Sequence, residues 1–149
     1  MSAVERDVVE FDPSPALWAR VGASFGHFGV DDAEHRGQLL RIEEDVLTPA
    51  GKRWFGVADD GEVVAMGALL VLEGVGYVDN VMTFPEARGR GFATAITACI
   101  VHEAREAGAE HVMLFADPDD PAVIRMYERL GFREVGRLAS TKGPVSSLA

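Results

Sequence analysis

The chain of 149 residues has little cysteine, few basic residues and no long apolar run. Cys99 is its only cysteine, so no disulfide can form within the chain, and a reduced cytoplasmic setting fits this. Lys and Arg number 14 against 24 Asp and Glu, which gives a formal charge of -10. Because phosphate backbones are bound by basic surfaces, nucleic acid is not an expected partner.

Two further absences concern membranes and metals. The longest apolar run, Val63 to Leu72, is far shorter than the roughly 20 residues that cross a bilayer, and the N-terminus lacks the basic start of a signal peptide. No membrane partner is therefore expected. The four histidines (His27, His35, His102 and His111) show no metal-ligand spacing, so no metal is predicted. Hydrophobic residues make up 48%, enough to build the core of a single domain spanning residues 1–149.

The order of predicted elements indicates one α/β (α+β) domain. Strands are expected near residues 4–11, 53–58, 62–72, 77–84, 111–116 and 132–138, and helices near 16–25, 31–46, 92–107 and 121–130. Asp31 and Asp32 can cap the second helix. The three central strands should form an antiparallel meander, and the crossover through helix 92–107 should be parallel. The prediction is a single mixed, mostly antiparallel sheet flanked by helices.

A glycine-rich turn, Arg88-Gly89-Arg90-Gly91, joins a predicted strand directly to a predicted helix. The start of a helix presents free N–H groups and partial positive charge, and glycine lets an anion approach the backbone. Arg88 and Arg90 can add charge-assisted hydrogen bonds. This pattern favours a phosphate-binding turn, and a solvated basic turn is the alternative. Neither a third glycine of a dinucleotide fingerprint nor the Lys-Ser/Thr of a Walker loop is present.

Two segments together resemble a known family. Arg88-Gly89-Arg90-Gly91-Phe92-Ala93 resembles the coenzyme A pyrophosphate motif of the GNAT superfamily of N-acetyltransferases. Met126-Tyr127-Glu128-Arg129-Leu130-Gly131-Phe132 resembles a second signature of that family, at the expected distance along the chain. The resemblance covers roughly Tyr77 to Gly136. It implies acetyl-CoA as co-substrate, no metal, an amine as acceptor, and the sheet architecture of that family. The oligomeric state, a homodimer included, stays open.

The resemblance also implies roles for the cofactor site. Main-chain groups of Val81 and Thr83 would face the pantetheine arm and the thioester. The residues that would hold the pyrophosphate are Arg88, Gly89, Arg90, Gly91, Phe92 and Ala93. Asp120 stands where family members often have an asparagine that contacts the arm, and a carboxylate cannot donate those amide hydrogen bonds.

Catalytic candidates follow from the chemistry of amine acetylation. By resemblance, Tyr127 would protonate the departing sulfur, because a phenol with pKa about 10 stays protonated at neutral pH. A core tyrosine is the alternative. Strand alternation places Tyr77, Asp79, Val81 and Thr83 on one face. Asp79, or else Tyr77, could then orient a water that takes the amine proton, although an exposed or salt-bridged carboxylate is the favoured interpretation of Asp79.

The sequence leaves several alternatives open. A coenzyme-A-binding sensor without turnover and a nucleotide-binding domain using the same loop both compete with the enzyme. The acceptor could be a polyamine, an amino acid, an antibiotic or a protein amine. Trp18 and Trp54 could line an acceptor pocket, but packing in the core is the favoured prediction for both.

Overall fold

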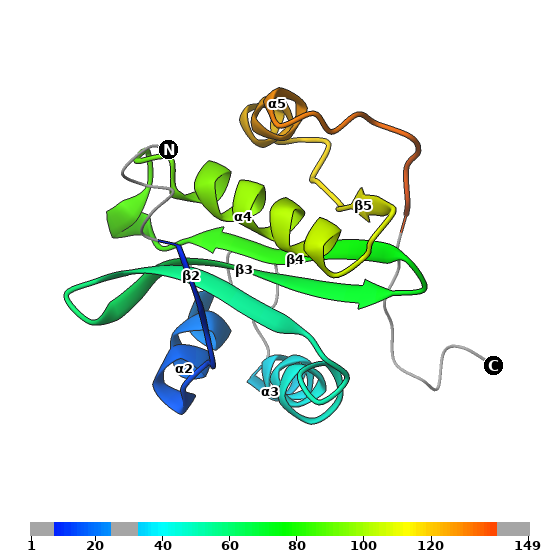
Figure 1. The fold of residues 1–149 in the computed structure, drawn as a ribbon. Coiled ribbons are helices and arrows are strands. Elements are labelled where there is room, and N and C mark those ends of the chain that lie inside the picture. Colours follow the sequence, from blue (N-terminus) through cyan, green and yellow to red (C-terminus); the bar gives the residue numbers. More distant parts are fainter. Residues whose placement is uncertain (1–7, 25–32, 140–149) are drawn as a thin grey trace.

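A computed structural model describes residues 8–24 and 33–139 as one sheet covered by helices on both faces (Figure 1). The strands, in sheet order, are β1 (Val9–Phe11), β2 (Arg53–Asp59), β3 (Glu62–Leu72), β4 (Val75–Thr83) and β5 (His111–Met113). Neighbours from β1 to β4 are antiparallel, whereas β4 and β5 are parallel. The predicted mixed, mostly antiparallel sheet, the central meander and the parallel crossover are therefore confirmed.

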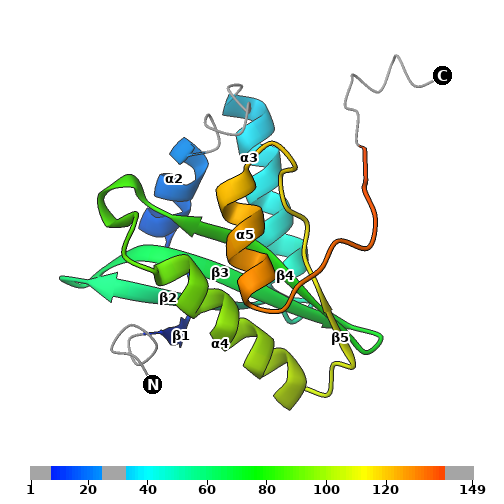
Figure 2. The same cartoon turned by 90° about the horizontal axis from the view of Figure 1, so that it is seen from above.

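The helices divide between the two faces of this sheet (Figures 1 and 2). One face carries α2 (Pro15–Ser24) and α3 (Ala33–Ile42), and α3 continues into a π-helical turn, η2 (Glu43–Leu47). The other face carries α4 (Phe92–Glu106) and α5 (Pro121–Arg129), and a short 3-10 turn, η3 (Pro85–Ala87), leads from β4 towards α4. Residues 1–7, 25–32 and 140–149 lie outside the described chain, and with them the predicted cap at Asp31 and Asp32.

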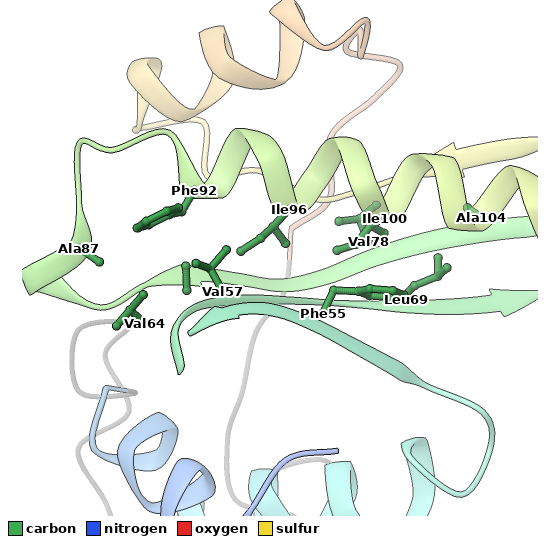
Figure 3. Packing of buried hydrophobic residues seen from close by; sticks show 11 residues of the cluster. Phe55, Val57, Val64, Leu69, Val78, Ala87, Phe92, Ile96, Ile100 and Ala104 are labelled. Atoms are coloured by element: carbon green, nitrogen blue, oxygen red, sulfur yellow. The ribbon is translucent and has the colours of Figure 1, made fainter. Parts of the chain in front are cut away.

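The core is built on the regular spacing of apolar residues in α4. Phe92, Ile96, Ile100 and Ala104 recur every four residues, so they share one face, and Figure 3 shows them directed at the sheet. All four are buried. A second cluster fills the opposite face, where Trp18 and Trp54 meet edge-on with ring centroids 5.2 Å apart. Both tryptophans are buried, so their predicted place in the core is confirmed.

The predicted strand at 132–138 is wrong. These residues follow α5 without forming a strand, and Val135 and Leu138 are 85% and 77% exposed. Alternating apolar residues make a strand only where a partner edge and a buried face are available. Here β5 ends after three residues, and Val135 and Leu138 of the segment stay exposed. Among the helices of the described residues, none is both long and apolar enough to cross a membrane.

Candidate active site

The turn between β4 and α4 has the backbone shape that the glycine pattern predicts. Gly89 and Gly91 adopt φ values of +77° and +80°, a backbone conformation that residues with a Cβ rarely adopt. Gly91 is the N-cap of α4 and supplies no side chain to the helix start. The first N–H groups of a helix have no intrahelical partner and carry partial positive charge. The turn therefore leaves main-chain donors available at the start of α4.

A cleft of about 350 Å³ opens beside this turn. The turn and the start of α4 form one wall, and residues 122–126 of α5 form the other. Its lining comprises Thr83, Ala87, Arg88, Gly89, Gly91, Phe92, Ala93 and Thr94 on the first wall, and Ala122, Val123 and Met126 on the second. Two segments that the sequence analysis singled out for the cofactor and for catalysis, 88–93 and the helix carrying Tyr127, thus border one space.

The cleft suits an anionic group such as a diphosphate. A Cβ placed on Gly89 or Gly91 would meet no atom within 4 Å, so both backbones face open space that a ligand can enter. Arg88 lines the cleft, and its Nε donates to the carbonyl of Thr83 at 3.2 Å. Arg90 does not line it: its guanidinium lies over the Phe92 ring, 4.7 Å from the centroid, and 3.8 Å from an Asp59 oxygen. A single arginine and free helix-start amides therefore face the cleft.

A bulge interrupts β4 just before it reaches the cleft. The register passes from Met66 opposite Met82 to Ala68 opposite Asp79, so Asn80 and Val81 together face the single residue Gly67. Asn80 has φ +54°, and its main-chain N–H donates to Asp79 Oδ1 at 2.9 Å. One extra residue in a strand shifts every later side chain to the other face.

The bulge corrects the predicted face of β4. Val81 packs into the core on the α4 side, close to Gly67. The Asp79 side chain points instead to the face that carries Trp54, where it meets Lys52. Simple alternation had predicted that Asp79 and Val81 share a face of the sheet. In the structure they lie on opposite faces. Because Gly67 lacks a side chain, Val81 can lie there with its methyl carbon 3.3 Å from the position a Cβ would take.

The edge of β4 that faces β5 is open beyond its first residues. β5 pairs only with Val75, Gly76 and Tyr77, and within the described chain the remainder of β4 has no strand on this side. Strand edges without a partner present unpaired N–H and C=O groups. The open stretch includes Val81 and Thr83, and Thr83 also lines the cleft. An extended molecule that enters the cleft could therefore continue along this edge.

A buried ionic cluster lies at the same part of β4. The sequence raised a salt-bridged Asp79, which is confirmed, but it did not indicate Lys52, Glu43 or Asn80 as members. Lys52 is 4% exposed, and its Nζ donates to both carboxylate oxygens of Glu43 at 2.9 and 2.7 Å. The same Nζ donates to Asp79 Oδ2 at 3.0 Å and to Asn80 Oδ1 at 2.6 Å. Its partners lie 9 to 28 positions away along the chain, so no local pattern could have indicated them.

Comparison with known proteins identifies the family. The acetyltransferase (GNAT) family model matches residues 18–132. The chain belongs to the GNAT family. It is 30% identical to a mycothiol acetyltransferase of Streptomyces griseus, covering 82% of this chain and 41% of that protein. It is 28% identical to an uncharacterized N-acetyltransferase of Bacillus subtilis, covering 72% of this chain and 42% of that protein. The chain thus spans less than half the length of either relative.

The fold comparison agrees with the family assignment. A putative acetyl transferase from Pyrococcus furiosus superposes with a TM-score of 0.73 at 19% identity, over 93% of this chain and 98% of that one. At that identity the likeness concerns the fold alone. The predicted membership of the GNAT superfamily and the predicted architecture are confirmed.

Two further residues singled out by the GNAT resemblance lie at the start of α5 and within it. The Asp120 side chain accepts a hydrogen bond from the Val123 N–H at 3.2 Å and so caps the helix, and Asp120 does not line the cleft. Tyr127 is 9% exposed and lies against Phe132, with ring centroids 6.0 Å apart. Burial raises the pKa of Tyr127, which keeps its hydroxyl protonated. Tyr127 follows Met126 of the cleft wall but is not itself among the lining residues.

The predicted site residues therefore fall into three groups. The cleft brings together Thr83, Arg88, Gly89, Gly91, Phe92 and Ala93. Four residues lie near the cleft but outside its lining: Val81 on β4, Arg90 in the turn before α4, Asp120 at the N-cap of α5 and Tyr127 within α5. Asp79 joins the ionic cluster around Lys52. In the described residues no group of three His, Cys, Asp or Glu side chains is placed to hold a metal ion.

Proposed function

We propose that this chain transfers an acetyl group from acetyl-CoA to an amine. The observation that carries the proposal is the cleft at the start of α4, where unpaired N–H groups, two open glycines and Arg88 face one space. These groups suit the diphosphate of a coenzyme. The names of relatives such as mycothiol acetyltransferase support acetyl as the acyl group.

Residues 88–93 and Thr83 would hold the cofactor, which supplies the activated acetyl thioester. The backbone amides from Arg88 to Ala93 would bind its diphosphate, with Arg88 adding charge. Main-chain groups of Val81 and Thr83 on the open edge of β4 would orient the extended arm, as a neighbouring strand would. The apolar residues Ala122, Val123 and Met126 would cover it from the α5 side and exclude water.

Two residues are the candidates for proton transfer, Tyr127 on α5 and Asp79 on β4. An alkylammonium must lose a proton before it can attack, since its nitrogen has no free electron pair. Tyr127 would give a proton to the departing sulfur, and burial keeps that proton in place at neutral pH. Asp79 is the candidate to orient the water that takes the amine proton. Both of its oxygens already accept a hydrogen bond, one from Lys52 and one from the Asn80 N–H.

The engagement of Asp79 favours one rival, a sensor that binds acetyl-CoA without turnover. Isothermal titration calorimetry and a thiol-release screen separate the two functions. We expect acetyl-CoA to bind while NAD and ATP do not, and we expect free thiol to appear with at least one class in a panel of polyamines, amino acids, aminoglycosides and peptides. Tight binding of acetyl-CoA without thiol release across that panel would support the sensor. Equal binding of ATP would contradict the coenzyme A site itself.

A further inference from the structure

The ionic cluster around Lys52 connects three separate parts of the fold. Glu43 comes from η2 after α3, Lys52 precedes β2, and Asp79 and Asn80 belong to β4. An ammonium group has three protons, and here four oxygen atoms lie within 3.0 Å of Nζ. The Trp54 ring lies below, with its centroid 4.9 Å from Nζ. All the donor capacity of Lys52 is therefore used inside the protein.

The cluster holds a strained position of the backbone. Asn80 has φ +54°, which is uncommon for residues other than glycine and persists where the surroundings enforce it. Its side-chain oxygen is fixed by Lys52 at 2.6 Å, and its main-chain N–H is fixed by Asp79 at 2.9 Å. Lys52 also holds the second oxygen of Asp79. One ammonium group thus contacts the side chain of Asn80, within the bulge, and that of Asp79, the residue just before it.

We propose that Lys52 is a positioning residue that sets the shape of the β4 bulge. The bulge directs Val81 towards α4 and sets how the open edge of β4 meets the cleft at Thr83. On this proposal Asp79 belongs to the same support: Lys52 holds one of its oxygens, and its other oxygen accepts from the Asn80 N–H. The catalytic consequence rests on the proposed function, because it concerns how the β4 edge meets the acyl donor. The structural consequence, a bulge held by Lys52, does not depend on that function.

The surroundings of Lys52 exclude a chemical role for its amine. A nucleophilic or basic lysine needs a neutral nitrogen with a free electron pair. Lys52 instead forms ion pairs with Glu43 at 2.7 Å and with Asp79 at 3.0 Å, and its side chain is 1% exposed. Four oxygen acceptors therefore surround its Nζ inside the protein, where a substrate has no direct access to it. Support of the backbone is the role that remains for it.

A test must avoid leaving an unpaired charge in the core. Lys52→Met alone would leave Glu43 buried without its partner, and such variants can fail to fold. The double variant Lys52→Met/Glu43→Gln removes the buried pair together, and Asp79, with a side chain 34% exposed, can be solvated. Glu43→Gln alone is the matched control, because Lys52 still reaches Asp79 and Asn80 in it. Thermal melts confirm that each variant is folded at the assay temperature.

Three readouts compare the double variant with Glu43→Gln. We expect its amide NMR shifts to change at residues 78–82, its affinity for coenzyme A to stay within about two-fold, and its kcat for thiol release to fall about 10- to 100-fold, as expected for a misplaced reacting geometry. The Michaelis constant for acetyl-CoA should stay close to that of the control. A loss of folding stability alone would not lower kcat while leaving the affinity for coenzyme A unchanged.

The outcomes distinguish this proposal from the proposed function. Unchanged amide shifts at 78–82 in a folded double variant would overturn the role of Lys52, whatever the enzyme does. Changed shifts with the control's full kcat would also overturn its role as a positioning residue for the reaction. If the wild-type chain binds coenzyme A but releases thiol with no amine, the proposed function fails, and the shifts alone then decide whether Lys52 holds the bulge.

Discussion

Gly76 of β4 lies directly under Ala104 of α4, and a Cβ on Gly76 would be 2.8 Å from the Ala104 Cβ. Neither atom is the end of a flexible side chain, so the helix or the strand would have to move. We therefore expect Gly76→Ala to lower the free energy of unfolding by about 1–3 kcal/mol, measured by urea denaturation. Adding Ala104→Gly should recover part of this loss, despite a helix cost of about 1 kcal/mol. Strictly additive effects of the two changes would contradict the contact.

Asp120 provides a test of helix capping against cofactor binding. Because its carboxylate accepts from the Val123 N–H, Asp120→Ala should destabilise the protein by about 1 kcal/mol, whereas Asp120→Asn should be close to neutral. Urea denaturation measures both. Calorimetry with acetyl-CoA on Asp120→Asn then tests the predicted cofactor role, since an amide can donate hydrogen bonds that a carboxylate cannot. An affinity that differs by more than a few-fold would show that Asp120 also contacts the cofactor.

Gly91 allows the phosphate site to be tested with a matched control. Gly91→Glu should abolish acetyl-CoA binding in calorimetry, because it places bulk and negative charge in the open space beside the helix start. Gly74→Glu is the control: Gly74 has a similar φ of +77°, also faces open space, and lies in the turn between β3 and β4. Both variants carry the same backbone strain. Wild-type affinity in a folded Gly91→Glu variant would place the cofactor elsewhere.

Tyr127 should affect turnover more than binding. Tyr127→Phe keeps the ring against Phe132 and removes only the hydroxyl that would protonate the sulfur. General acid catalysis contributes about 100-fold or more, so we expect kcat to fall by that order while the acetyl-CoA dissociation constant changes little. Stopped-flow thiol release and calorimetry measure the two quantities. Undiminished kcat would rule out the acid role.

Burial of the tyrosines predicts a pH dependence. Burial raises the pKa of Tyr127, and burial together with the negative charge of Asp79 raises the pKa of Tyr77. Each folded-state pKa then exceeds the ordinary value of about 10, so the associated stability is complete below pH 10 and is lost as the pH rises through the folded pKa. Ultraviolet absorbance should show tyrosine ionisation with a midpoint above the ordinary tyrosine pKa. Since the chain has two tyrosines, Tyr77→Phe isolates Tyr127, and a transition at the ordinary pKa would contradict its burial.

Local patterns predicted the elements whose signals lie close together in the sequence. The helical spacing of Ile96, Ile100 and Ala104 identified α4, and the two glycines identified the turn before it, since periodicity and backbone freedom are properties of short segments. The strand predicted at 132–138 failed for the opposite reason, because a strand depends on a partner edge that the segment itself does not encode.

The bulge of β4 and the partners of Lys52 were missed because they depend on distant contacts. Alternation treated β4 as regular, whereas Asn80 adds a residue and reverses the face of everything after it. Asparagine tolerates positive φ better than most residues, and that was the one signal available in the sequence. The partners of Lys52 lie up to 28 positions away, so only the fold brings them together.

The two walls of the cleft belong to helices that are far apart along the chain. α4 and α5 are joined only through the connection at residues 107–120, which includes the three-residue strand β5, and Tyr127 is the one buried residue of α5. A molecule that fills the space between Gly91 and Val123 replaces solvent with contacts on both helices at once. The bound acyl carrier would then supply packing contacts that hold α5 against α4. Hydrogen exchange along α5 should therefore be slower in the cofactor-bound protein than in the free protein.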